Sequence, residues 1–180
     1  MPDDNVDSGQ PPQLEDSRLL GWRLAVVIAS LCLGIFLFGL DVNIIGVAIP
    51  RITTFFNSLP DVAWYGSAYL LALTAFQPMF GNLYKYFNAK VVYLVSLIIF
   101  EVGSVICAAA PTSPALIFGR AFLGLGAAGL LQGALAIIGH VVPIEKIPLF
   151  QGIVISSLAI SVTVGPVIGG ALTEYVSWRE

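Results

Sequence analysis

The sequence predicts an all-α integral membrane protein with five transmembrane helices. Hydrophobic residues make up 57% of its 180 residues and charged residues only 11%, a composition that a soluble domain hardly reaches. Five apolar stretches, separated by short connections, fill the chain from Leu24 to about Thr173. Each has about the 20 residues that a helix rising ~1.5 Å per residue needs to cross a ~30 Å hydrocarbon core.

The expected helices span about 24–49, 62–80, 91–110, 115–139 and 149–172. The first is expected to end before Pro50 and the third at Pro111, because proline cannot donate a backbone hydrogen bond inside a helix. The second is entered through Trp64 and Tyr65, aromatic residues typical of a membrane interface.

The fourth and fifth helices are rich in small residues. Gly129 and Gly133 are one turn apart in the fourth helix. Small residues recur every four positions in the fifth helix, at Ser157, Ser161, Gly165 and Gly169. Such stripes predict that a neighbouring backbone packs closely against each helix.

The first 22 residues predict a disordered acidic tail, because they are polar and rich in proline, glycine, serine and aspartate. The basic residues set the expected orientation. With the tail in the cytoplasm, the inner segments hold five of them and the outer segments two: Arg18, Arg23, Lys85, Lys90 and Lys146 against Arg51 and Arg179. This bias predicts a multi-pass protein with a cytoplasmic N-terminus.

Several other classes of function are not expected. Cys32 and Cys107 fall inside apolar runs and are interpreted as packing residues, and His140 is the only histidine, so no metal site or other cofactor is predicted. The G-x-G-x-x-G pattern at 124–129 lies inside a membrane-length helix, the wrong context for a dinucleotide. Without a basic patch or a catalytic set at membrane depth, neither a nucleic-acid partner nor an enzyme is predicted.

Three charged residues lie within the apolar runs: Asp41, Glu101 and Arg120. Each costs about 2.5 to 3.5 kcal/mol at the bilayer centre, so each needs a partner or a wet cavity. Asp41 lies roughly 26 Å above the cytoplasmic start of its helix and Arg120 roughly 8 Å below the outer start of its own. Both depths fall in the outer half of the bilayer, which predicts that the two side chains pair.

We interpret Asp41 and Arg120 as a candidate proton-coupling pair that faces a central cavity. A nearby guanidinium favours the ionised carboxylate and removal from water favours the neutral acid, so small movements can switch protonation. The alternative is a static pair. Glu101 lies near mid-membrane and is either a second proton site or a hydrogen-bonded structural acid.

Four segments resemble signature motifs of the major facilitator superfamily, and in particular of its 14-span drug:proton antiporters. They are Leu40–Pro50, Gly81–Lys90, Gly119–Gly129 and Gly165–Gly170. The tyrosines of the second segment and the run Phe100–Ser104 are similar to the fungal toxin efflux pumps. The second segment resembles the family's motif A, on the inner loop after helix two, and the fourth resembles the antiporter motif.

This resemblance implies proton-coupled efflux of hydrophobic drugs or toxins across a bilayer, most simply the plasma membrane. The partners would be lipid, protons and a hydrophobic small molecule. Asp41 and Arg120 would couple protons with help from Glu101. The resemblance also assigns residues to two motifs: Gly81, Lys85 and Lys90 to the motif A loop, and Gly165, Pro166, Gly169 and Gly170 to a bend with close packing in the fifth helix.

The chain departs from the family pattern in two places. Lys85 stands where an acidic residue is usual and Asn88 where a glycine is usual, so the salt-bridge latch ascribed to motif A is not expected in its common form. The family also continues after Arg179 with a sixth helix. We therefore expect 23–180 to be an incomplete transmembrane domain, a truncated N-terminal half that does not transport alone; a structural or regulatory membrane protein without transport activity is the alternative.

Overall fold

The computed structural model describes residues 21–56 and 59–175, which form five long α-helices. In chain order these are α1 Trp22–Phe56, α2 Val62–Tyr86, α3 Ala89–Ala109, α4 Ser113–Val141 and α5 Ile147–Tyr175, with short 3-10 turns at Leu59–Asp61 and Ile144–Lys146. The expected acidic tail lies almost wholly outside the described residues, since Gly21 is a turn and Trp22 already begins α1.

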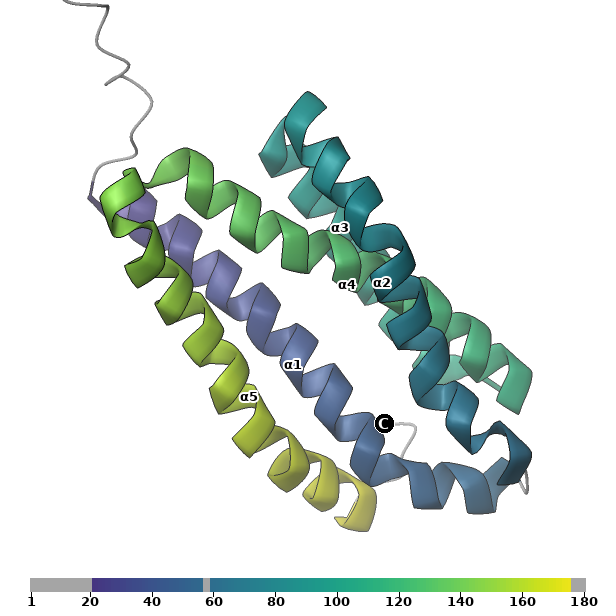
Figure 1. The fold of residues 1–180 in the computed structure, drawn as a ribbon. Coiled ribbons are helices and arrows are strands. Elements are labelled where there is room, and N and C mark those ends of the chain that lie inside the picture. The colour runs from purple at the N-terminus through teal and green to yellow at the C-terminus, as the bar shows by residue number, and fades with distance from the viewer. Residues whose placement is uncertain (1–20, 57–58, 176–180) are drawn as a thin grey trace, which may run out of the picture.

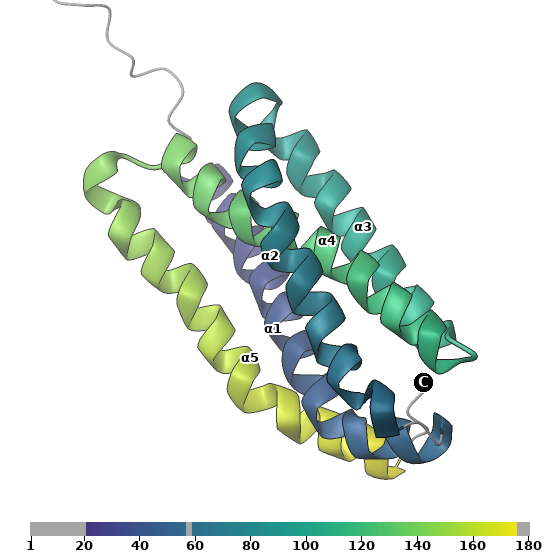
Figure 2. The same cartoon turned by 45° about the vertical axis from the view of Figure 1, so that its right-hand side comes forward.

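The helices form two groups that meet at α4. Figure 1 shows α1 and α5 running alongside each other, and Figure 2 shows α2 and α3 meeting near the top of the view, with α4 beside α3. α2 and α3 both pack extensively on α4, whereas α1 packs mainly on α5 and touches α4 more lightly. Helix α4 is therefore the element that joins both groups.

Four helical segments are long and apolar enough to cross a membrane: Trp22–Val47, Ala89–Ala109, Ser113–Val141 and Ile144–Gly170. Helix α2 has 25 residues, which is also enough length, but it is less apolar than the others. Its tyrosines at 65, 69 and 84 are buried against the bundle. The predicted all-α membrane fold is confirmed, and the buried tyrosines account for part of the lower hydrophobicity of α2.

Two helix ends differ from the sequence prediction. Helix α1 does not stop before Pro50 but continues to Phe56, and its ribbon bends near that end (Figure 1). A proline removes one backbone hydrogen bond and kinks a helix without having to end it, and such kinks are tolerated in membrane helices. Helix α2 continues past Phe80 to Tyr86, because the buried Tyr84 donates a hydrogen bond to the Gly129 carbonyl oxygen at 3.0 Å.

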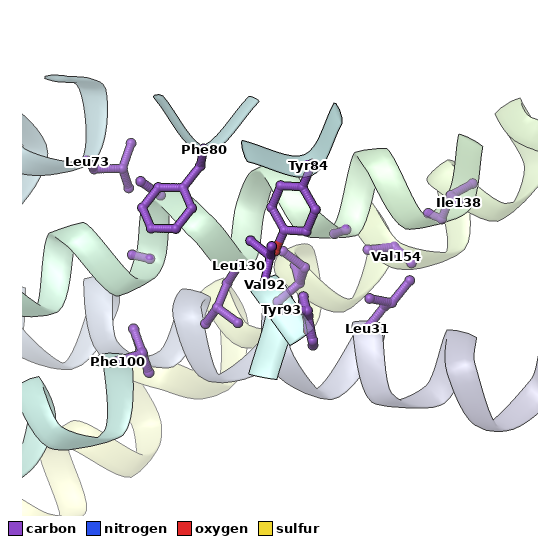
Figure 3. Close-up of a cluster of buried hydrophobic side chains, with 14 of the residues drawn as sticks. Leu31, Leu73, Phe80, Tyr84, Val92, Tyr93, Phe100, Leu130, Ile138 and Val154 are labelled. Atoms are coloured by element: carbon purple, nitrogen blue, oxygen red, sulfur yellow. The ribbon is translucent and has the colours of Figure 1, made fainter. Parts of the chain in front are cut away.

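The main apolar core receives side chains from all five helices, and a smaller cluster of Tyr65, Ala110 and Leu116 lies apart from it. Figure 3 labels several of the main core's members: Leu31, Leu73, Phe80, Tyr84, Val92, Tyr93, Phe100, Leu130, Ile138 and Val154. Large apolar side chains also cover the outside, where Leu71, Phe118 and Val167 are each more than two-thirds exposed. So much exposed apolar surface is unfavourable in water, so it supports the membrane reading.

Glycines let the backbones of α3 and α2 approach α4. A Cβ atom added to Gly126 would lie 2.5 Å from the Phe100 backbone nitrogen and 2.7 Å from its Cα, and one added to Gly103 would lie 2.7 Å from the Leu123 Cα. A Cβ added to Gly124 would clash with the backbone carbonyl oxygen of Tyr69. Close backbone packing on the fourth helix is therefore present, but at Gly124 and Gly126. An added Cβ at Gly129 or Gly133, the expected pair, would instead meet the side chains of Ser96 and Tyr84.

The ends of α2 and α4 that follow the α1–α2 and α3–α4 connections are joined by polar side chains. Ser113 Oγ donates a hydrogen bond to Asp61 Oδ2 at 2.6 Å and lies 2.8 Å from the Tyr65 hydroxyl oxygen. Both Tyr65 and Ser113 are buried. This network fixes the two helix ends relative to each other on the side of the bundle where Asp41 and Arg120 lie.

Candidate functional site

A buried ion pair joins α1 to α4. Arg120 Nη1 donates a hydrogen bond to Asp41 Oδ2 at 2.9 Å. The Arg120 side chain is 5% exposed and that of Asp41 is 20% exposed. The structure thus brings together the two residues that the sequence placed at matching depth, although they are 79 positions apart in the chain.

The energetics of this pair depend on both partners being present. Removal of either charge from water costs several kcal/mol, which the mutual attraction and a charge-assisted hydrogen bond offset. If one partner is lost, the other becomes an uncompensated buried charge, at a cost of about 3 to 5 kcal/mol. Asp41 is the more exposed member of the pair.

Residues from α2 and α3 complete the surroundings. The Tyr69 ring of α2 lies with its centroid 5.8 Å from Arg120 Cζ, a cation–π geometry, and 6.4 Å from the ring centroid of Phe38. Cys107 of α3 is half-buried, and its sulfur atom lies against Gly119, the residue before Arg120 in α4. Four helices therefore converge on the Asp41–Arg120 pair.

The sequence reading missed Tyr69, and a usable signal was present. Tyr69 comes seven residues after Val62, the start of α2, and Arg120 comes seven residues after Ser113, the start of α4. Both helices start at the same end of the bundle, so the two side chains lie at the same depth. A comparison of depths that includes uncharged polar side chains also places the Tyr69 hydroxyl level with Arg120.

Glu101 lies apart from the pair. It is exposed on α3 and, within the described residues, has no ion-pair or hydrogen-bond partner. It faces a cavity of about 660 Å³ between α1, α3 and the end of α4. Lys90, Tyr93 and His140 also line this cavity, whose surface is otherwise mostly apolar. The structure therefore separates Glu101 from the Asp41–Arg120 pair.

The residues assigned to the motif A loop are mostly helical, contrary to the expected loop. Gly81 and Lys85 belong to the last turns of α2, and Lys90 to the first turn of α3. The reason is that α2 continues to Tyr86, while Asn88 caps α3 by accepting a hydrogen bond from the Lys90 backbone nitrogen at 3.0 Å. In the described part of the chain neither lysine forms an ion pair.

The antiporter-motif glycines form the contact between α5 and α1. A Cβ atom added to Gly165 would lie 2.7 Å from the Asn43 Cβ, and one added to Gly169 would lie 3.4 Å from the Ile44 Cα. Pro166 lies on the exposed side of α5, which continues through it to Tyr175. Gly170 is half-buried, and a Cβ there would meet nothing within 4 Å. Gly165 and Gly169 therefore pack α5 against the part of α1 that contains Asp41, which lies two residues before Asn43.

Metal ligands do not gather in the described ranges 21–56 and 59–175. Within them there is no group of three or more His, Cys, Asp or Glu side chains that could hold an ion. His140 belongs to the last turn of α4. Its ring nitrogen Nδ1 lies 2.7 Å from the Ala136 carbonyl oxygen. That contact, one helical turn away, is a local helix-end interaction.

The fold and the buried pair define a polytopic α-helical membrane protein with charged side chains kept at membrane depth. Comparison with known proteins identifies the family: residues 31–180 match the Major Facilitator Superfamily. The chain belongs to the major facilitator superfamily, as its motifs predicted.

Curated relatives are fungal efflux pumps. The chain is 48% identical over 163 residues to the MFS-type efflux pump MFS1 of Trichophyton rubrum, covering 91% of this chain and 30% of that protein. It is 47% identical over 175 residues to efflux pump hmp6 of Hypomyces subiculosus (97% and 31%) and 48% identical over 163 residues to efflux pump aflT of Aspergillus parasiticus (91% and 32%). The chain thus spans about a third of the length of these curated relatives.

Proposed function

We propose that this chain supplies the first helices of a proton-coupled exporter of hydrophobic drugs or toxins. The observation that carries the proposal is the buried Asp41–Arg120 pair, an acid and a base held together at membrane depth. Intramembrane ionisable pairs of this kind mark proton relays and substrate pathways. The relatives are named efflux pumps, which supports outward movement of a small molecule.

In this proposal Asp41 takes up a proton from water and the ion pair opens. The neutral acid no longer holds the guanidinium, so α1 and α4, which otherwise touch only lightly, are free to change their relative position. Loss of the proton restores the pair. Glu101 is proposed as a second acid that faces the α1–α3 cavity, and the glycines of α5 as the surface on which α1 is seated.

We expect Asp41→Asn to abolish proton-driven transport. The full-length gene product is reconstituted in vesicles loaded with the pH indicator pyranine, and efflux of Nile red or rhodamine 6G is driven by an imposed pH gradient. Asparagine preserves the shape of the side chain but cannot carry a proton, so dye flux no longer follows the gradient, while exchange of dye against dye continues.

The matched control for that experiment is Glu145→Gln. It removes a carboxylate that is exposed in the 3-10 turn before α5, at the very start of the Ile144–Gly170 segment, and is expected to leave the flux unchanged. An Asp41→Asn protein that keeps the rate and pH dependence of the wild type would refute the role of Asp41. A wild-type protein that moves neither dye would contradict the exporter proposal.

We also propose a plasma-membrane location with a cytoplasmic N-terminus. Arg23, Lys85, Lys90 and Lys146 are all exposed at one end of the bundle, where α1, α3 and α5 begin. In intact cells, a membrane-impermeant maleimide is expected to label Pro60→Cys at the opposite end, and Lys146→Cys only after permeabilisation. The wild-type chain with Cys32 and Cys107 sets the background, and the reverse labelling pattern would invert the topology.

A further inference from the structure

The hydroxyl of Tyr69 is a buried polar group beside the ion pair that no hydrogen bond in the described part of the chain uses. Its side chain is 3% exposed and its hydroxyl has no hydrogen-bond partner there, and the same is true of Arg120 Nε. Buried hydroxyls without partners are unfavourable and uncommon. Two such orphan groups next to one charged pair indicate that the pair has a second arrangement in which the hydroxyl is used.

The ionisable groups around Asp41 are few. Arg120 faces it from α4, Tyr69 from α2, and the Cys107 thiol interacts with it from α3. Helix α5 contributes no titratable side chain between Ile147 and Gly170. When Arg120 leaves the carboxyl group, Tyr69 is therefore the strongest hydrogen-bond donor left among these ionisable groups, since a thiol donates only weakly.

We propose that Tyr69 is a positioning residue for proton uptake by Asp41. In the ion-paired state its ring face holds the Arg120 guanidinium. When a proton from water binds the Asp41 carboxylate and Arg120 is released, the Tyr69 hydroxyl donates a hydrogen bond to the neutral carboxyl group and keeps its own proton. The inference rests on the proposed function, because it gives Tyr69 a part in the proton uptake proposed for Asp41.

The test compares two tyrosines that are both buried and both lack a hydroxyl partner among the described residues. Tyr69→Phe keeps the ring and removes only the hydroxyl. Tyr93→Phe is the matched control, because the Tyr93 hydroxyl lies against Gly34 of α1, and Tyr93 lines the cavity that Glu101 faces rather than contacting the ion pair. Infrared difference spectra of the full-length gene product in lipid, recorded across a pH step, report the C=O band of protonated Asp41. Loss of the band in Asp41→Asn assigns it.

In Tyr69→Phe the band is expected to move to higher wavenumber, because the carboxyl group loses a donor. The Asp41 carboxyl group of this variant is expected to be half-protonated at a pH about half to one unit lower than in the wild type. The variant lacks one neutral hydrogen bond that stabilises the protonated acid, and a shift of this size corresponds to the free energy of one such bond. Tyr93→Phe should leave both quantities at their wild-type values. Tyr69→Leu, which also removes the ring, should in addition lower gradient-driven dye flux at least tenfold.

A band position and midpoint in Tyr69→Phe that coincide with those of the wild type would overturn the assignment. Equal shifts in Tyr69→Phe and Tyr93→Phe would also overturn it, since they would report a general effect of hydroxyl loss on packing. Failure of the exporter proposal has a different signature: the wild-type protein would then show no gradient-driven flux, while the infrared response of Asp41 to Tyr69→Phe would be unaffected by that result.

Discussion

Replacement of Arg120 by leucine is expected to abolish transport and to lower the free energy of unfolding by about 3 to 5 kcal/mol. The guanidinium is almost fully buried and its Nη1 is bound to Asp41 Oδ2 at 2.9 Å. Leucine fills part of the same volume but leaves the carboxylate in the bundle without its cation. The measurement is denaturant unfolding of the chain in micelles, followed by far-ultraviolet circular dichroism, beside dye flux in the full-length gene product.

The double variant Asp41→Asn with Arg120→Leu separates the two effects. Removing both charges leaves no unpaired ion, so most of the lost stability should return while transport stays absent. Arg23→Leu, at the exposed start of α1, is the control for loss of an arginine and should change neither quantity. A double variant no more stable than Arg120→Leu alone would mean that the pair is not the source of the destabilisation.

The second large effect is expected from Gly126→Ala, a change of a single methyl group. Its Cβ would lie 2.5 Å from the Phe100 backbone nitrogen, and a helix backbone cannot move aside as a flexible side chain does. Helices α3 and α4 must therefore separate, at a cost on the order of 1 to 3 kcal/mol. The same unfolding measurement, with loss of gradient-driven dye flux in the full-length gene product, reports the effect.

Gly139→Ala provides the matched control on the same helix. A Cβ added there meets nothing within 4 Å, so the substitution should be neutral or slightly stabilising, because alanine is the better helix former. If the two variants unfold at the same denaturant concentration, the contact between Gly126 and Phe100 does not limit how closely α3 and α4 approach.

The sequence predicted the class of fold and the ion pair because both follow from one-dimensional quantities. Stretches of about 20 apolar residues give the helices, and residue counts along them give depth, which was enough to place Asp41 opposite Arg120. Depth along a helix does not predict in which direction a side chain points around the helix axis. The sequence therefore could not predict that Glu101, also an acid within an apolar run, lies on a different face of the bundle.

Helix ends were predicted less well, because they depend on tertiary contacts. Pro50 predicted an end that the structure places at Phe56, and Gly81 was read as the start of a loop although α2 continues to Tyr86. In the second case the contact of Tyr84 with Gly129 on α4 holds the last turns in helical form. The local sequence indicates the helix propensity of a segment, but it does not reveal which other helix the segment packs against.

Asp41 and Arg120 are 79 positions apart in the chain, and this separation also sets an order of events during synthesis. Helix α1 leaves the ribosome first. At about 5 to 20 residues per second, the guanidinium that neutralises the Asp41 carboxylate follows roughly 4 to 16 s later. In that interval the carboxyl group has no cation. The nascent segment must wait either as a neutral acid or in a hydrated part of the insertion machinery, and it settles into lipid only when its partner helix has been made.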